Sequence, residues 1–297
     1  MTFYTQISNN IKKTWLLISV FTFIILGIGF LFDYFAPESN GIFIIFALVF
    51  STINIFFSYF YSDKIILKIS KASPVKRSEN KELYNIVENL SITAGLPMPQ
   101  LYIIQEKAPN AFATGRDPKH SVVCVTSGLL EILNKSELEA VVAHEMSHIG
   151  NRDILLASVV AVLVSTIILL IRYLSRILMF SKNDRDNPLG IFILIFTIIS
   201  LILTPLISRF IQLAISRKRE FLADAGSVRL TRYPDALISA LEKISSSSIA
   251  MKNVSEVTRG MFISDPIKQN KKSWFHKAFM THPPVEDRIN ALKNMNM

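Results

Sequence analysis

The chain has 297 residues, half of which are hydrophobic and 21 of which are phenylalanine, and its mean hydropathy is +0.37. This composition excludes an ordinary soluble globular protein and indicates a membrane protein. The formal net charge is +9, but the basic residues mostly flank apolar runs, so we interpret them as topology determinants beside anionic lipid and exclude nucleic acid as a partner. The single cysteine, Cys124, excludes an intrachain disulfide and is expected to be a core residue, since it lies in an apolar run.

Two long apolar runs open the chain. Residues 15–32 and 41–60 are each long enough to span a bilayer, and no small-residue cleavage pattern follows the first, so we interpret it as a retained anchor. The link between the runs is acidic and both outer flanks are basic, which places the flanks in the cytoplasm by the positive-inside rule. The sequence therefore predicts a transmembrane hairpin within residues 1–62.

Residues 63–153 have the composition of a globular domain. Apolar residues at helical spacing predict a helix from Ser78 to Thr93, ended by Gly95. Short β-branched segments predict strands at Gln100–Gln105 and Ser121–Val125. We expect these strands to belong to a small antiparallel sheet.

The next predicted helix begins with Ser136 as its N-cap and Glu139 at the capping-box position, and it carries the sequence His144-Glu145-Met146-Ser147-His148. Two histidines four residues apart on a helix share one face and can bind one metal ion. Neutral imidazole suits Zn²⁺, and Glu145 would lie beside the open coordination position, where it can take a proton from metal-bound water. The alternative is a helix with two solvent-facing histidines, but the apolar neighbours indicate a buried helix.

Two further apolar runs, residues 154–171 and 189–207, predict a second transmembrane hairpin within residues 154–207. Four crossings would return both termini and both globular parts to one side of the membrane. The link between these two runs contains four basic residues, which conflicts with a simple charge count. Either the more basic inner flanks outweigh this link, or the two runs form a hairpin that does not fully cross; we favour crossing.

A catalytic zinc needs a third protein ligand, which must come from elsewhere in the chain. The best candidate is Glu220, which shares a face with Asp224 on a helix predicted from Phe210 to Leu230. Asp224 would then accept the free ring N–H of one histidine and so orient it. The alternative is an ordinary exposed acid pair among basic residues. Further helices are predicted at Pro234–Ile244 and Val285–Leu292.

Four separated motifs resemble the HtpX membrane zinc metalloproteases of bacteria, which belong with the CAAX prenyl proteases among the gluzincins. In chain order they are Ala108–Gly115, His144–His148, Glu220–Asp224 and Thr281–Arg288. The resemblance implies a mainly α membrane protein with four transmembrane helices and an α+β zincin-like metalloprotease domain. Residues 63–153 and 208–297 would form the two parts of that domain.

The function that the resemblance implies is that of an endopeptidase of the bacterial inner membrane with its active site facing the cytoplasm. It would cleave misfolded or damaged membrane proteins in quality control, with one Zn²⁺ per chain. Carried over by motif, His144, His148 and Glu220 would bind the metal, Glu145 would be the general base, and Asp224 would support a ligand from behind. The oligomeric state is not predicted.

The other matching positions receive roles in the same way. Residues Asn110, Ala111, Phe112, Ala113 and Thr114 match an edge strand near the site, and such a strand can hold an extended substrate by main-chain hydrogen bonds. His282 and Arg288 match residues near the zinc, where they would stabilise the oxyanion; the alternative for His282 is a cap on the final helix. His120 and His276 are expected to be structural or surface residues, with a fourth, inhibitory metal ligand as the alternative for His276.

Two other functions remain open from the sequence. A CAAX-type processing protease with a defined substrate would carry more membrane segments, enclosing a chamber. A catalytically silent membrane scaffold is disfavoured because the candidate metal ligands and the candidate base are all present.

Overall fold

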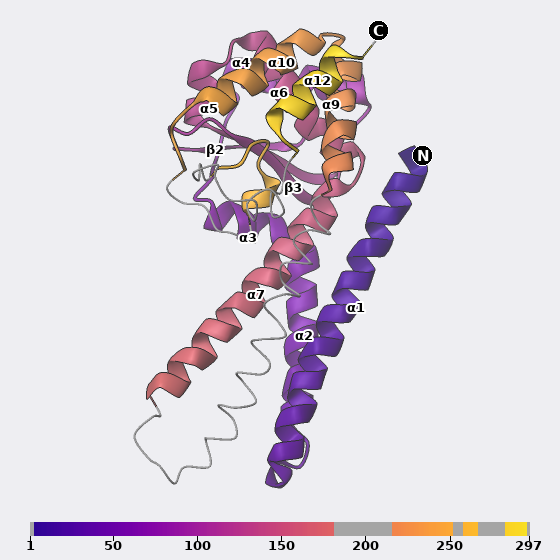
Figure 1. Cartoon of the computed structure of the whole chain (residues 1–297), viewed down its shortest axis with the longest axis vertical. Coiled ribbons are helices and arrows are strands. Elements are labelled where there is room, and N and C mark those ends of the chain that lie inside the picture. The colour runs from indigo at the N-terminus through magenta and orange to yellow at the C-terminus, as the bar shows by residue number, and fades with distance from the viewer. Residues whose placement is uncertain (1–2, 181–215, 252–257, 267–282, 296–297) are drawn as a thin grey trace.

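The computed structural model describes residues 3–180, 216–251, 258–266 and 283–295. A globular part of helices and one sheet lies at one end, and three long helices extend from it (Figure 1). The helices are α1 (Phe3–Phe35), α2 (Ile42–Phe60), α3 (Ser62–Ile69), α4 (Lys81–Ala94), α5 (Ser127–Ile132), α6 (Lys135–Gly150), α7 (Asp153–Phe180), α9 (Arg217–Thr231), α10 (Pro234–Ser246) and α12 (Val285–Lys293), with 3-10 turns η1 (Pro37–Ser39) and η2 (Arg259–Met261).

Three helices of the described ranges are long and apolar enough to cross a membrane, namely α1, α2 and α7. Their candidate spans are Ile7–Phe35, Ile42–Phe60 and Asp153–Arg172. The first begins earlier than predicted, because the helix runs unbroken through the polar residues before the apolar run. The fourth predicted run, 189–207, lies outside the described residues.

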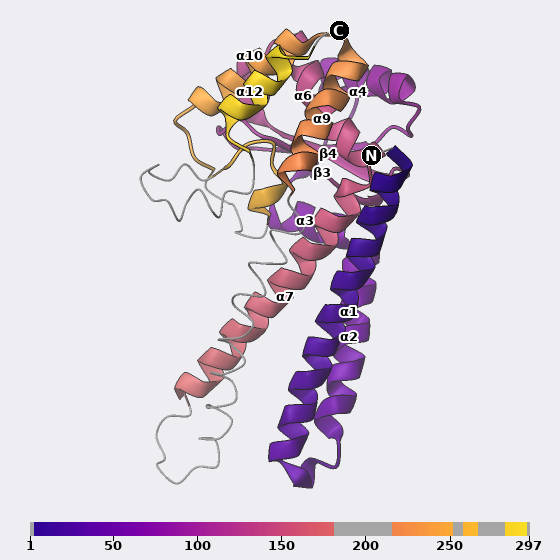
Figure 2. The ribbon, with the colours of Figure 1, turned by 45° about the vertical axis from the view of Figure 1, so that its right-hand side comes forward.

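A close helix pair forms the first predicted hairpin. Helices α1 and α2 lie side by side in both views (Figures 1 and 2). Gly29 makes this approach possible, because a Cβ there would lie 2.7 Å from the Cβ of Ala47. At the connecting turn, the Asp33 carboxylate accepts hydrogen bonds from the N–H groups of Phe43 (3.2 Å) and Ile44 (2.8 Å) and so satisfies the exposed start of α2.

The sheet has four strands in the order β1-β2-β4-β3, and it is mixed. The strands are β1 (Ser73–Pro74), β2 (Gln100–Ile104), β3 (Ala111–Asp117) and β4 (His120–Thr126). Strands β2 and β4 are parallel and the other pairs are antiparallel, so the expectation of a purely antiparallel sheet is wrong. Strand β4 of the tight β3–β4 hairpin lies between β2 and β3 and runs parallel to β2, so β3 lies at the edge of the sheet.

Helix α6, which carries the histidine motif, is the centre of the globular part. It packs against α4, α9, α10 and strand β3, and α12 packs in turn on α9 and α10. These helices lie together at the end of the globular part that is far from the long helices (Figure 2). Residues Ala140, Val141, Val142 and Ala143 are all fully buried. A helix that is apolar on every side is typical of a core position, as its sequence predicted.

The start of α6 differs from the prediction. The N-cap is Asn134 and not Ser136, because the Asn134 carboxamide accepts from the N–H of Glu137 at 3.0 Å while the Glu137 carboxylate accepts from the N–H of Asn134 at 2.8 Å. This capping box has the same spacing as the predicted Ser136–Glu139 pair, but it lies two residues earlier. Glu137 takes the capping-box position, and its carboxylate also accepts hydrogen bonds from α10, from Ser239 at 2.6 Å and from Lys243 at 2.8 Å.

The other predicted helices are found close to their expected places. Helix α4 ends at Gly95, which takes the left-handed conformation (φ 64°) as the sequence predicted. Helices α9, α10 and α12 match the predictions for the last part of the chain; residues 210–215 of the first lie outside the described ranges.

We predict that Glu137→Gln lowers the stability of the fold. Burial alone would raise the pKa of Glu137, but hydrogen bonds from Lys243, Ser239 and Asn134 lower it, so its contribution is present at neutral pH and is lost as the pH falls through this lowered pKa. A loss of about 1–2 kcal/mol corresponds to a melting temperature about 2–4 °C lower. Thermal unfolding in detergent at pH 7 and at acid pH measures the difference in melting temperature between wild type and Glu137→Gln. Glu139→Gln on the same helix is the control. If Glu137→Gln lowered the melting temperature equally at both pH values, the ionised Glu137 carboxylate would not be the source of the stability.

Candidate active site

The two histidines of α6 face the same point. Their Nε2 atoms lie 3.2 Å apart, as expected for side chains one helical turn apart on one face. The side chain of His144 is 1% exposed and that of His148 is 16% exposed. One histidine is therefore sealed in the core, and the other borders an opening.

Glu220 completes this group from α9. Its carboxylate oxygens lie 3.8 Å from Nε2 of His144 and 3.6 Å from Nε2 of His148. The close approach of α9 to α6 brings it there: a Cβ at Gly226 would lie 2.3 Å from Oγ of Ser147. One turn away from Glu220, Asp224 on the same helix is also buried. The alternative of an exposed acid pair is therefore wrong.

The three side chains fit a metal ion of the zinc type. One ligand atom from each lies within 4.8 Å of the others. In a tetrahedral site with bonds of about 2.0–2.1 Å, the ligand atoms stand about 3.3 Å apart. The two Nε2 atoms are 3.2 Å apart, and each lies near a different oxygen of Glu220, at 3.8 Å for His144 and 3.6 Å for His148. Two imidazoles and one carboxylate, with a fourth position left open, are a donor set that catalytic zinc uses.

Asp224 and Arg288 lie behind His144. Nδ1 of His144 is 2.9 Å from Oδ1 of Asp224, and the guanidinium of Arg288 binds the same carboxylate at 2.6 and 2.9 Å. Burial would raise the pKa of Asp224, but the charge and hydrogen bonds of Arg288 lower it to about 2. Burial lowers the pKa of His144. A neutral imidazole that donates from Nδ1 to Asp224 leaves its Nε2 lone pair for a metal.

Arg288 does not lie where the oxyanion role would need it. It is 1% exposed, and it also donates to the carbonyl of Ile263 at 2.9 Å. Its position is on the Nδ1 side of His144, opposite the metal-facing nitrogen. The structure therefore corrects the expected contact: Arg288 touches Asp224, and its charge keeps that carboxylate ionised.

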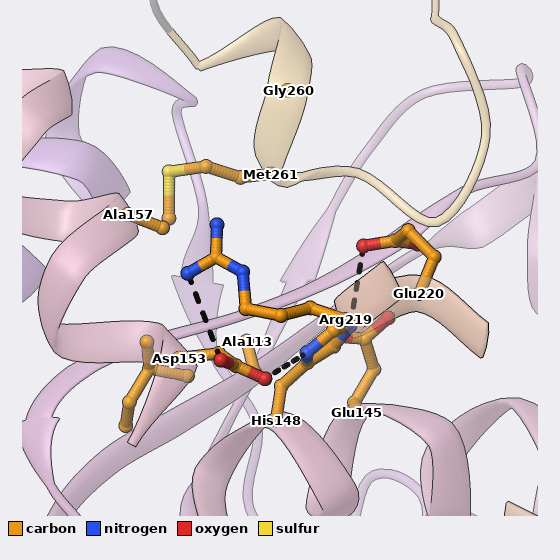
Figure 3. Close-up of a pocket in the computed structure, with 10 residues that line it drawn as sticks. Ala113, Glu145, His148, Asp153, Ala157, Arg219, Glu220, Gly260 and Met261 are labelled. Atoms are coloured by element: carbon orange, nitrogen blue, oxygen red, sulfur yellow. Dashed lines mark hydrogen bonds and ion pairs between the residues drawn. The ribbon is translucent and has the colours of Figure 1, made fainter. Parts of the chain in front are cut away.

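Asp153 supports His148 in the same way, and sequence reasoning missed it. Its Oδ2 lies 3.0 Å from Nδ1 of His148 (Figure 3). Its Oδ1 accepts from Nδ2 of Asn10 on α1 at 2.7 Å. Burial would lower the pKa of His148, but the bond to Asp153 and the charges of Glu220 and Asp153 raise it to about 9. The same negative surroundings that hold a proton on this ring also favour a divalent cation. The sequence feature that could have identified Asp153 is its position five residues after the second histidine.

Glu145 lies between the two histidines and is 2% exposed. Burial raises the pKa of its carboxyl to about 7, and the charge of Glu220 adds to that effect. Opposing contributions come from His148 and from the N–H of Ala113, which donates to the carboxylate. A carboxylate with a pKa near neutrality can both take and return a proton.

The start of edge strand β3 is covered by the chain itself. The N–H of Ile263 donates to the carbonyl of Ala111 at 2.9 Å, and the side-chain amide of Asn110 donates to the carbonyl of Ser264 at 2.9 Å. Residues 262–264 therefore occupy the edge at these two positions. The predicted substrate strand is present as an edge strand, but Asn110 and Ala111 are already hydrogen-bonded here.

The remaining three residues of the predicted substrate strand differ from one another. Phe112 is 1% exposed and packs in the core. Thr114 is fully buried, and its hydroxyl lies 2.8 Å from that of Ser158 on α7. Ala113 alone lines the cavity beside Glu145 (Figure 3). Among the five residues, it is the one that the structure brings to the metal group.

That cavity contains a further side chain that sequence reasoning missed. It is bounded by Glu145, His148 and Glu220, by Arg219 of α9, and by Met261 of η2 (Figure 3). Arg219 directly precedes Glu220, so it looked like part of a basic cluster. The structure instead places its guanidinium in the cavity, 3.6 Å from Asp153.

The other histidines and the cysteine are placed as follows. His120 is exposed and binds Asp117 at 2.9 Å, so it is a surface residue as expected. His276 and His282 lie outside the described residues. Cys124 is fully buried, and burial raises the pKa of its thiol, so it stays protonated, in agreement with a core role.

Comparison with known proteins agrees with this geometry. Residues 77–296 match the family model "Peptidase family M48". A "Protease HtpX homolog" from Streptococcus uberis is 42% identical, covering 98% of this chain and 99% of that protein. One from Thermoanaerobacter pseudethanolicus is 43% identical, covering 100% and 99%.

A solved structure has a similar fold. It is the "Crystal Structure of S. mikatae Ste24p", with a TM-score of 0.52 and 19% identity. The alignment covers 94% of this chain and 66% of that one. At this identity the likeness concerns the fold alone. Together with the family match and the relatives along the whole chain, these observations show that the chain belongs to peptidase family M48, as a membrane metalloprotease of the HtpX type.

Proposed function

We propose that this metalloprotease is a zinc-dependent endopeptidase that cleaves misfolded or damaged membrane proteins. The observation that carries the proposal is the convergence of His144, His148 and Glu220 within 4.8 Å, with the buried carboxylate of Glu145 beside them. The match to relatives named as HtpX proteases supports the same reaction class.

The metal would be held by His144, His148 and Glu220, and zinc bound there supplies a Lewis acid and a water of lowered pKa. Glu145 takes a proton at its carboxylate and returns it to the leaving amine of the substrate. Its buried carboxylate lines the cavity beside the metal group, within reach of both transfers. Asp224 and Asp153 each hold the Nδ1–H of one histidine, which keeps both Nε2 atoms directed at the metal.

We assign the substrate to the cavity beside Ala113. The N–H of this residue meets Glu145, so a peptide that lies along this part of β3 passes next to the base. Binding through main-chain groups makes little demand on the substrate's sequence, which suits a protease for damaged proteins.

The proposed location is the bacterial inner membrane, with the site facing the cytoplasm. Basic residues flank the first hairpin on the side of the globular part, and the connecting turn is acidic. The chain would comprise membrane hairpins at 1–62 and 154–207 and a protease domain built from 63–153 and 208–297. Membrane proteins with exposed juxtamembrane segments would be the substrates.

The first prediction of this proposal concerns Glu145 and Glu220. Glu145→Gln should keep about one zinc per chain and lose cleavage of casein by about 10²- to 10⁴-fold, because the amide cannot take a proton. Glu220→Gln should lose metal as well as activity. Zinc content and casein cleavage on detergent-purified protein measure both, with the exposed Glu242→Gln as control. If Glu145→Gln still cleaves casein at the wild-type rate, Glu145 is not the general base.

A second prediction separates the support of His148 from its metal bond. Asp153→Asn should weaken zinc binding about 10- to 100-fold, since the carboxylate no longer holds the Nδ1–H. Titration with a zinc chelator of known affinity measures this, and Asp235→Asn, an exposed site on α10, is the matched control. Unchanged zinc affinity in Asp153→Asn would remove Asp153 from the site.

A third prediction tests the orientation. A membrane-impermeant maleimide added to spheroplasts should label Glu38→Cys, in the turn between α1 and α2, and leave Lys293→Cys unlabelled. Inverted vesicles should give the opposite result. The native Cys124 is fully buried and keeps the background low. Labelling of Lys293→Cys from outside the cell would place the active site on the other face.

A further inference from the structure

Arg219 carries an unusual combination of burial and unused donors. Its side chain is 9% exposed, and its Nη1 is buried without a hydrogen-bond partner among the described residues. Among the described residues, Oδ1 of Asp153 lies 3.6 Å from this atom. Leaving a buried polar group without a hydrogen bond is costly, so such a group in a native fold needs an explanation.

Asp153 does not supply that explanation. Its Oδ1 already accepts from Asn10 at 2.7 Å, and its Oδ2 lies 3.0 Å from Nδ1 of His148. The arginine therefore adds a favourable charge to this carboxylate but no short hydrogen bond. A guanidinium has five N–H donors in a fixed planar arrangement, so most of them are left for another acceptor.

The direction of the side chain shows where that acceptor would lie. Figure 3 shows the guanidinium reaching from α9 across the cavity, past Asp153 and towards Met261 and Ala157. The same cavity is lined by Glu145, His148 and Ala113. Nη1 lies on the Asp153 side, and the rest of the guanidinium points towards Met261, into the space in which a bound peptide would meet the metal group (Figure 3).

The charges around the cavity select the kind of acceptor. Glu145, Glu220 and Asp153 line it together with Arg219, and the three negative charges are matched by this arginine and a bound divalent cation, so the lining does not need an anionic acceptor. The remaining lining near the arginine is apolar, from Ile154, Ala157 and Met261 among others. A neutral oxygen flanked by apolar groups matches this environment, and a peptide carbonyl is such an oxygen.

We propose that Arg219 binds a main-chain carbonyl oxygen of the substrate next to the scissile peptide bond. This rests on the proposed function, since it assumes that a peptide enters the cavity at the metal. The contact fixes the direction and depth of the peptide without reading its side chains. Because Ala113 of β3 lines the same cavity, the peptide would lie between two elements, α9 and β3.

The test compares two metal-binding ligands on the zinc-loaded, detergent-purified protein. Acetohydroxamate chelates the metal but has no peptide arm. An amide-capped dipeptide hydroxamate adds main-chain carbonyls and no carboxylate. The substitution Arg219→Met keeps the length and burial of the side chain and removes its donors, and affinities are measured by calorimetry in both proteins.

Arg219→Met should lower the affinity for the dipeptide hydroxamate about ten- to a hundredfold, as expected for the loss of a hydrogen bond to a charged group. The affinity for acetohydroxamate should stay unchanged. Replacing the amide of the dipeptide with an alkene isostere removes the carbonyl; this ligand should bind wild type and Arg219→Met equally. Arg219→Lys, which keeps the charge beside Asp153, serves if the methionine variant does not fold. It should still weaken the dipeptide ligand selectively, since its single ammonium cannot reproduce the planar donors.

Other results overturn the assignment in distinct ways. Equal weakening of both hydroxamates would mean that Arg219 acts through Asp153 and His148 on the metal, and no weakening of either would exclude a contact. Wild-type protein that binds neither zinc nor acetohydroxamate would overturn the proposed function and this contact with it. If the protein binds zinc and acetohydroxamate normally but its affinity for the dipeptide hydroxamate does not change in Arg219→Met, the contact alone is overturned.

Discussion

The close contact between α6 and α9 is the constraint on which the active site depends. The two histidines belong to one helix, α6, and the third ligand, Glu220, comes from another helix, α9. Gly226 and the bond from Ser227 to the carbonyl of Ala140 (2.7 Å) let the second helix approach closely enough for Glu220 to reach them. Any side chain at 226 would push the helices apart and separate the ligands, although it would lie more than a turn away from the metal.

Charge balance explains why so many ionisable groups are tolerated in a buried place. Three carboxylates, those of Glu145, Asp153 and Asp224, lie beside the metal group, which contains a fourth in Glu220, and uncompensated burial of each would be costly. Asp224 is matched by Arg288 with two hydrogen bonds, whereas Arg219 lies beside Asp153 at a looser 3.6 Å. The first arrangement is closed, and the second leaves donors directed at the cavity. The two arginines of this site therefore have different chemistry: one is structural support and the other is open to a ligand.

Local sequence patterns revealed the helices and the metal motif well. The His144–His148 spacing and the apolar surroundings of this segment come from one helix, so no knowledge of tertiary contacts was needed. The mixed sheet and the N-cap at Asn134 were missed because each depends on a partner distant in the chain: β4 inserts beside β2, and Glu137 is held by Lys243. Arg219 was missed for the same reason, since basic neighbours in the sequence hid a side chain that turns inward.

The hydrogen bond from Asn10 to Asp153 joins the first membrane helix to the catalytic machinery. Asn10 is 3% exposed, and it also donates to the carbonyl of Asn151 at 3.1 Å, in the break between α6 and α7. The N-terminal helix is thus a component of the active site as well as an anchor. A soluble fragment trimmed to the globular part would leave Asp153 one donor short, and dissecting this enzyme into a water-soluble catalytic unit would remove part of the site itself.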